Sequence, residues 1–191
     1  AGGALDADIA VLELDEAYAV HFVEQVRPDY ALLLNVMRDQ LDRFGEIDNT
    51  ARLLSRVAAA TTGTVVLNRE DPRIAALAQV VPSGTRTVHF GLSQALRRFF
   101  PTDDDMATTF ERDAAPAVPA AEPAAGTVAD VMLTGVGDHR AQLLIDGTEY
   151  DSEVRLEGVY NLYNAAAALA VVRAVQANVR NPQAIRERAA R

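Results

Sequence analysis

The chain has 191 residues, 49% of them apolar, which suits one domain or one and a half around a real hydrophobic core. Its formal net charge of −9 argues against nucleic acid or an anionic membrane as the main partner, because phosphate groups attract basic patches. The absence of cysteine excludes disulfides and thiolate metal sites, and all 18 basic residues are arginine, so no lysine can hold a phosphate.

The first hundred residues alternate between short apolar runs and stretches with helical spacing. The apolar runs predict strands at 9–14, 30–34, 64–68 and 87–91. The stretches between them predict helices at 16–26, 46–60 and 71–80, the last with Asp71 as its N-cap and Pro72 in its first turn. Continuous apolar strands that alternate with helices predict an α/β fold, with a mostly parallel sheet flanked by helices.

The alternation stops near residue 100, and three further segments follow the unit 1–100. Residues 101–127 are rich in Ala, Pro and acidic residues without any period, which predicts a mobile linker. Residues 128–157 alternate between apolar and polar, with a hairpin signal at Asp146 and Gly147, and predict a small antiparallel β element. Residues 158–191 predict a long alanine-rich helix after Gly158 and a second helix capped by Asn181, both returning to the first unit.

Polar residues gather where the predicted parallel strands end, and ligands bind at such carboxyl ends in open sheets. The polar residues at the ends of the first three strands and just after them are Glu13, Asp15, Glu16, then Asn35, Arg38, Asp39, Asp42, then Asn68, Glu70 and Asp71. Such a cleft suits a hard cation with water ligands and a phosphate. The structural alternative is that these residues cap helices and form turns.

Two groups stand out as candidate binding residues. Glu13 lies within an apolar run, where a buried carboxylate is costly unless it is paired or holds a metal, although it could also face solvent at a sheet edge. Asn161 and Asn164 are three residues apart and share a face of the predicted helix, so their carboxamides could contact an adenine edge while Tyr160 stacks on the ring. The alternative is a capping Asn161 and a solvent-facing Asn164.

Five stretches together resemble a known family. "AVLELDEAY", "LLLNVMRDQLDRFGEID", "TVVLNREDP", "VHFGL" and "GVYNLYNAAAALA" occur in this order. Over about residues 7–92 and 128–178, the chain resembles the central, ATP-binding domain of the Mur ligase family. Amino-acid-adding members usually show "DHLDRH" and "HN..N". Here Gln40 and Tyr160 replace those histidines, as in the MurT branch, the ATP-using subunits of lipid II isoglutaminyl synthases.

The resemblance implies ATP and Mg²⁺ as cofactors. By the family motif, Glu13 falls on the Mg²⁺-ligand glutamate, Asn161 and Asn164 fall on the adenine-contacting asparagines, and Tyr160 falls on the neighbouring ring residue. Asn35 and Asp39 lie in the turn that lines the same cleft, whereas Asn68 and Asp71 match a motif that we interpret as structural. Relatives in this branch often insert a four-cysteine zinc ribbon after "FGL", and the linker 101–127 stands there instead, so no zinc is expected.

The activity implied is that of an ATP-dependent carbon–nitrogen ligase. It would activate the α-carboxylate of the D-glutamate residue of the lipid II stem peptide for amidation with glutamine-derived ammonia from a GatD-type glutaminase subunit, in the cytoplasm at the inner face of the membrane. The family's phosphate loop is expected upstream of Ala1, and the C-terminal domain, which contacts the glutaminase, after Arg191. We therefore expect no catalytic residue within these 191 and an inactive chain on its own.

Two alternatives to this function remain open. One is another Mur or folylpolyglutamate-type ligase domain, which Gln40 and Tyr160 disfavour. The other is a non-catalytic α/β module used for protein contact, which the missing phosphate loop favours.

Overall fold

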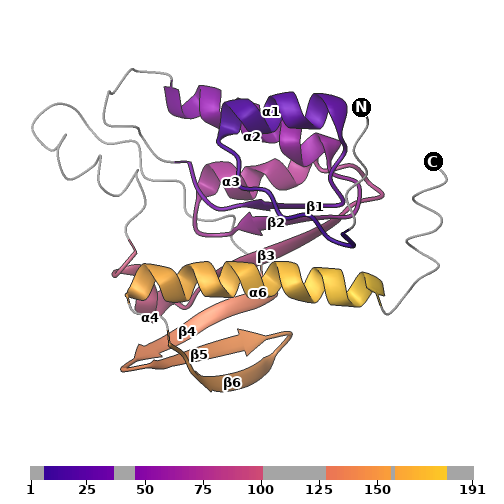
Figure 1. Cartoon of the computed structure of the whole chain (residues 1–191). Helices are drawn as coiled ribbons and strands as arrows, with labels where there is room; N and C mark the ends of the chain where they lie inside the picture. Colours follow the sequence, from indigo (N-terminus) through magenta and orange to yellow (C-terminus); the bar gives the residue numbers. More distant parts are fainter. Residues whose placement is uncertain (1–6, 37–45, 101–127, 156–157, 180–191) are drawn as a thin grey trace, which may run out of the picture.

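A computed structural model describes residues 7–36, 46–100, 128–155 and 158–179 of the chain. The sheet is drawn in Figure 1 between two groups of helices. Its strands are β1 (Tyr30–Leu33), β2 (Thr64–Asn68), β3 (Arg86–Leu92), β4 (Val131–Gly137), β5 (Arg140–Ile145) and β6 (Thr148–Glu153). The helices are α1 (Glu16–Gln25), α2 (Glu46–Ala60), α3 (Pro72–Ala76), α4 (Gln94–Arg97) and α6 (Val159–Val179), with a 3₁₀ turn, η1, at Leu77–Val80.

All six strands form one sheet, in the order β1-β2-β3-β4-β5-β6. The pairs from β1 to β4 are parallel, and the pairs β4–β5 and β5–β6 are antiparallel. The predicted α/β class, with a mostly parallel sheet and a small antiparallel part, is therefore confirmed. The antiparallel strands extend the parallel sheet, because β3 pairs with β4 from Phe90 opposite Val131 to Leu92 opposite Leu133.

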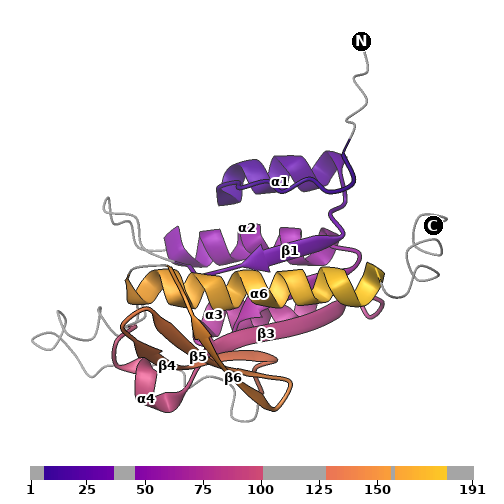
Figure 2. The same cartoon turned by 60° about the horizontal axis from the view of Figure 1, so that its bottom comes forward.

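Two hydrophobic cores lie on the two faces of the sheet. Residues of β1 and β2 such as Leu33 and Leu67 pack with α2, α3 and η1, and α1 packs on the outside of α2. On the other face α6 lies along the strands, and Phe90, Leu133 and Ala167 belong to its core. Figure 2 shows the long helix α6 across the middle of the molecule, with α1 and α2 above it and β4, β5 and β6 below it. β2 is buried at every position because both faces of the sheet are covered there.

Local signals set the ends of several elements. The Asp15 side chain accepts from the backbone N–H of Tyr18 at 2.8 Å and caps α1. The predicted Asp71 cap of α3 is also confirmed, with Pro72 at the first helical position. The Asp146–Gly147 turn joins β5 to β6, as predicted, with φ angles of 48° and 80° at its two residues. Positive φ at both positions is what a tight hairpin turn requires.

The strand predicted at 9–14 is wrong. Residues 7–15 adopt no helix or strand, and the side chains of Ile9, Val11 and Leu12 are 65%, 91% and 57% exposed. A strand needs backbone partners, and among the described residues β2 is the only strand that pairs with β1. Apolar character alone therefore predicted a strand that has no neighbour in the described structure.

Several other expectations lie outside the described residues. They are the turn with Arg38, Asp39 and Asp42, the linker 101–127, and the helix after Asn181. Among the helices that are described, none combines the length and the apolar character needed to cross a membrane.

Candidate functional site

Polar side chains at the carboxyl end of β2 hold the segment that follows β1. Asn68, the last residue of β2, donates through Nδ2 to the carbonyl oxygen of Leu34 at 2.7 Å. Asp71 accepts the backbone N–H of Val36 at Oδ2, also at 2.7 Å, while its other oxygen caps α3. Both side chains are buried, so the structural interpretation of Asn68 and Asp71 agrees with their contacts. Asn35, between the two fixed backbone groups, is exposed.

A buried ionic cluster lies at the ends of β2 and β3. Arg69 donates to Glu70 Oε1 through Nε at 2.9 Å and Nη2 at 2.6 Å, and its Nη2 also donates to the Leu92 carbonyl. The Leu92 N–H donates to the same Glu70 oxygen at 3.0 Å. Glu70 Oε2 has no hydrogen-bond donor among the described residues, but Arg97 Nε lies 2.8 Å away and neutralises it by charge. The cluster thus joins β2, β3 and α4.

The sequence did not point to this cluster. Arg97 would be expected on a solvated helix face, and its side chain is indeed 41% exposed, but it forms an ion pair with a carboxylate that is only 7% exposed. The pair joins residues that are 27 positions apart, so no local pattern indicates it. The only available signal was the charged pair Arg69 and Glu70 directly after a strand whose centre, Val65 to Leu67, is apolar.

The first turn of α6 carries the predicted adenine-contacting residues. Gly158 precedes the helix with a φ of 86°, in the left-handed region that favours glycine. Asn161 and Asn164 are exposed and share a face of the helix, as predicted. The Tyr160 ring is 57% exposed and packs edge-on against Phe100, with 5.3 Å between the ring centroids. An exposed aromatic ring beside two carboxamides can stack on a planar base and bond to its edge.

Tyr163, on the buried side of the same turn, was missed as a site residue. Its hydroxyl donates to Asn68 Oδ1 at 2.5 Å, and its ring lies 5.2 Å from that of Phe90. Burial, together with the negative charge of Glu70, raises the pKa of the Tyr163 hydroxyl far above its ordinary value. The hydroxyl therefore keeps its proton and acts as a donor at any working pH.

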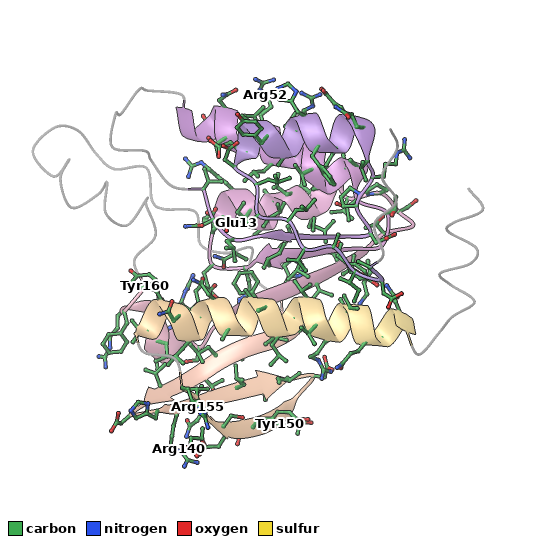
Figure 3. The ribbon with its side chains drawn as sticks, in the orientation of Figure 1. Glu13, Arg52, Arg140, Tyr150, Arg155 and Tyr160 are labelled. Atoms are coloured by element: carbon green, nitrogen blue, oxygen red, sulfur yellow. The ribbon has the colours of Figure 1, made fainter. Side chains whose placement is uncertain are left out.

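Glu13 lies in the extended segment before α1. Figure 3 shows Tyr160 at the N-terminal end of α6 and Glu13 above that helix, nearer the middle of the molecule. The prediction that Glu13 lies in a strand is wrong, because Glu13 is exposed and belongs to no strand. An exposed carboxylate remains available to a ligand, so its metal role stays a prediction.

The described oxygen donors at the strand ends are few for a Mg²⁺ ion. Mg²⁺ keeps several waters and takes one or two protein carboxylates together with substrate phosphates. Within the described ranges no three His, Cys, Asp or Glu side chains form a metal-binding group. Glu13 and Asn35 are both exposed and each offers an oxygen donor, which is the kind of ligand that Mg²⁺ takes. Asp39, the other predicted cleft residue, lies outside the described residues.

A shallow hollow of about 340 Å³ adjoins the same helix. It is lined by Val136, Gly137, Asp138, His139, Gly158, Val159 and Leu162. At about 100° per helical residue, Val159 and Leu162 face away from Asn161 and Asn164. The hollow is therefore distinct from the exposed carboxamide face.

The comparisons with known proteins agree on one family. A family model described as the Mur ligase middle domain matches residues 3–172. The chain is 29% identical over 182 residues to the lipid II isoglutaminyl synthase (glutamine-hydrolyzing) subunit MurT of Streptococcus pneumoniae, covering 87% of this chain and 40% of that protein. It is 32% identical over 173 residues to a UDP-N-acetylmuramoylalanine–D-glutamate ligase of Burkholderia cenocepacia, covering 88% of this chain and 33% of that protein. The chain thus spans 33% to 40% of the length of these relatives.

Solved structures show the same fold. MurF from Acinetobacter baumannii matches with a TM-score of 0.56 and 18% identity, over 83% of this chain and 28% of that chain. A pseudomurein peptide ligase type C from Methanothermus fervidus matches with a TM-score of 0.53 and 16% identity, over 78% of this chain and 32% of that chain. At such identities the likeness concerns the fold alone.

Proposed function

This chain belongs to the Mur ligase family as a middle domain, and from that premise we propose that it binds ATP with Mg²⁺ as part of an ATP-dependent carbon–nitrogen ligase. The observation that carries the proposal is the exposed face of the first turn of α6, where Asn161 and Asn164 stand beside the exposed ring of Tyr160. Each carboxamide offers both a donor and an acceptor, which is what the edge of adenine requires.

The metal would be held by Glu13, with Asn35 and Asp39 orienting its waters. The ion, when bound with ATP, neutralises the charge that develops on the transferred phosphoryl group. The side chains of this chain have a simpler task, which is to bind the base and to keep the nucleotide in one orientation at the carboxyl edge of the sheet. The Glu13 carboxylate is an oxygen donor, and an oxygen donor suits a hard cation such as Mg²⁺.

We further propose that the whole protein is a MurT-like subunit of a lipid II isoglutaminyl synthase. The 29% identity to MurT across 87% of this chain supports this, as does a tyrosine at position 160. The γ-phosphoryl group would pass to the α-carboxylate of the D-glutamate residue of the lipid II stem peptide. Ammonia from a GatD-type glutaminase would then displace the phosphate and leave the amide. Such a protein works in the cytoplasm, at the inner face of the membrane.

A second candidate is an amino-acid-adding Mur ligase. It is favoured by the 32% identity to the UDP-N-acetylmuramoylalanine–D-glutamate ligase over 88% of this chain. Here the activated carboxylate would be attacked by the amine of D-glutamate in place of ammonia. The two candidates share the ATP site and differ only in the acceptor and the nucleophile.

The deciding experiment uses the full gene product, supplied with Mg-ATP. One arm contains lipid II with glutamine and a GatD-type glutaminase, and the other contains UDP-N-acetylmuramoylalanine with D-glutamate. We expect amidated lipid II in the first arm.

Glu13→Gln should lower turnover by about a hundredfold or more, because it removes a transition-state charge interaction. Asn161→Ala should mainly raise the ATP concentration needed, because adenine contacts are made equally in ground and transition states.

The outcomes separate the alternatives. A product only in the second arm would assign the protein to the amino-acid-adding ligases. No ATP consumption in either arm would favour the non-catalytic module. Near-normal turnover of Glu13→Gln would show that this glutamate is not the metal ligand. Because Glu13 is exposed, the Glu13→Gln variant should unfold at the same thermal midpoint as the wild type. This measurement serves as the folding control.

A further inference from the structure

A chain of hydrogen bonds connects the first turn of α6 to the end of β1. It begins at Tyr163, which stands between Asn161 and Asn164 in sequence but on the buried side of the helix. Its hydroxyl donates to Asn68 Oδ1 at 2.5 Å, across the carboxyl end of β2. This contact joins residues 95 positions apart and is buried.

Asn68 connects Tyr163 to the end of β1. Its Oδ1 also accepts the Glu70 backbone N–H at 2.9 Å, and its Nδ2 donates to the Leu34 carbonyl at 2.7 Å. With two donors on the oxygen and an acceptor on the nitrogen, the carboxamide can take only one orientation. The Tyr163 hydroxyl is one of the two groups that set this orientation.

The chain ends on both sides of Asn35. Asn68 binds the carbonyl of Leu34 before it, and Asp71 binds the N–H of Val36 after it at 2.7 Å. Asn35 itself is exposed. Its backbone is therefore fixed while its side chain remains open to a ligand.

We propose that Tyr163 is a positioning residue of the nucleotide site, which holds the carboxamide face of α6 and the Asn35 turn at a fixed spacing. This inference rests on the proposed function, in which Asn161 and Asn164 contact the base and Asn35 lies on the metal side. A nucleotide that bridges the two places binds well only if the spacing is set before it arrives. Loss of the hydroxyl loosens the spacing and weakens ATP binding, although Tyr163 touches no ligand.

The simpler explanation, a fastening that only stabilises the fold, has a matched control in the chain. Asn178 Nδ2 donates to the Tyr30 hydroxyl at 2.5 Å. This bond joins α6 to β1 and has the same length as the Tyr163–Asn68 bond, which joins α6 to β2, but it lies near the opposite end of α6. Tyr30→Phe and Tyr163→Phe each remove one such bond and keep the ring. Because the Tyr30 bond is only part-buried, a purely structural role predicts a larger loss of stability in Tyr163→Phe but the same ATP affinity in both variants.

The test compares these two variants with the wild-type chain by NMR without ligand and by Mg-ATP titration. Since the Leu34 carbonyl belongs to the peptide group of Asn35, the Asn35 amide reports directly on the Asn68 bond. In Tyr163→Phe we expect a shifted Asn35 amide resonance, faster exchange of the Asn68 side-chain amide, and ATP affinity weaker by about three- to tenfold. In Tyr30→Phe all three should stay at wild-type values.

The NMR measurements and the ATP titration can each overturn the proposal independently. An Asn35 resonance and Asn68 exchange that are the same in both variants would overturn the positioning role, whatever ATP does. Equal ATP affinity in both variants, with wild-type binding intact, would overturn it as well. Absence of ATP binding by the wild-type chain and by the full gene product would instead count against the proposed function. Asn68→Asp, which replaces the donor to Leu34 by an oxygen, should reproduce the Asn35 shift with the Tyr163 hydroxyl still present.

Discussion

Gly91 of β3 shows how one missing side chain makes room for a charged cluster. A Cβ atom at this position would lie 2.7 Å from Glu70 Oε1 and 3.0 Å from Arg69 Nε. The Arg69–Glu70 pair therefore lies directly over the strand, where any residue larger than glycine would displace it. Because Glu70 is buried, its displacement would separate a carboxylate from the donors that compensate for its burial.

We therefore predict that Gly91→Ala lowers the free energy of unfolding by about 1–3 kcal/mol, the usual cost of overpacking. Gly84→Ala is the matched control, because a Cβ there meets no atom within 4 Å, and it should change stability by less than about 0.5 kcal/mol. Urea unfolding of both variants gives the comparison. Equal stabilities would show that the ion pair can move aside without cost.

At the scale of elements, the sequence predicted what local signals determine. The helix predicted at 46–60 has those bounds in α2, and the Asp71 cap and the Asp146–Gly147 turn appear where the residues indicate them. The strand at 9–14 failed because strand formation depends on a neighbour far away in the sequence. The candidate site also contains features that local signals determine and features that depend on residues far apart in the sequence.

The exposed Asn161 and Asn164 could be predicted from helical spacing. The Tyr163–Asn68 and Arg97–Glu70 contacts could not, because each joins residues that only the folded sheet brings together.

The central strand β3 has a measurable electrostatic consequence. β3 pairs with β2 on one side and with β4 on the other, and its residue His89 is half-buried. Burial lowers the pKa of His89, nearby Asp130 opposes this effect, and Arg69 adds to it. As the pH falls below about 6.5, the unfolded chain binds this proton before the folded chain does. Protonation of His89 therefore lowers stability as the pH falls through that window.

We predict that His89→Gln removes this part of the pH dependence. The variant should gain stability relative to the wild type as the pH is lowered from about 7.5 to about 5.5, since only the wild type carries the shifted imidazole. Unfolding free energies of both proteins at several pH values give the difference, in which the other titrating groups cancel. A difference that is constant with pH would contradict a lowered pKa.

At the scale of the molecule, one sheet serves two cores. Ile74 of α3 is fully buried with β1 and β2 on one face, and Ile145 of β5 is 6% exposed in the core under α6 on the other. The antiparallel strands continue the same sheet, and α6 contacts β1 to β4. This continuity argues that the parallel and antiparallel parts unfold together, although the sequence divides them at 101–127.

Ile74→Val and Ile145→Val test this directly, one in each core. Each removes one methylene and should cost about 0.5–1.5 kcal/mol. If the sheet is a single cooperative unit, either variant lowers the opening free energy of the slowest-exchanging amides in both β2 and β5, by the same amount as the global unfolding free energy. Native-state hydrogen exchange followed by NMR measures both strands in one sample. Faster exchange in β5 alone for Ile145→Val, with β2 unchanged, would show that the antiparallel strands open as a separate unit. In that case the stability lost in one core would not be transmitted to the other core through β3 and β4.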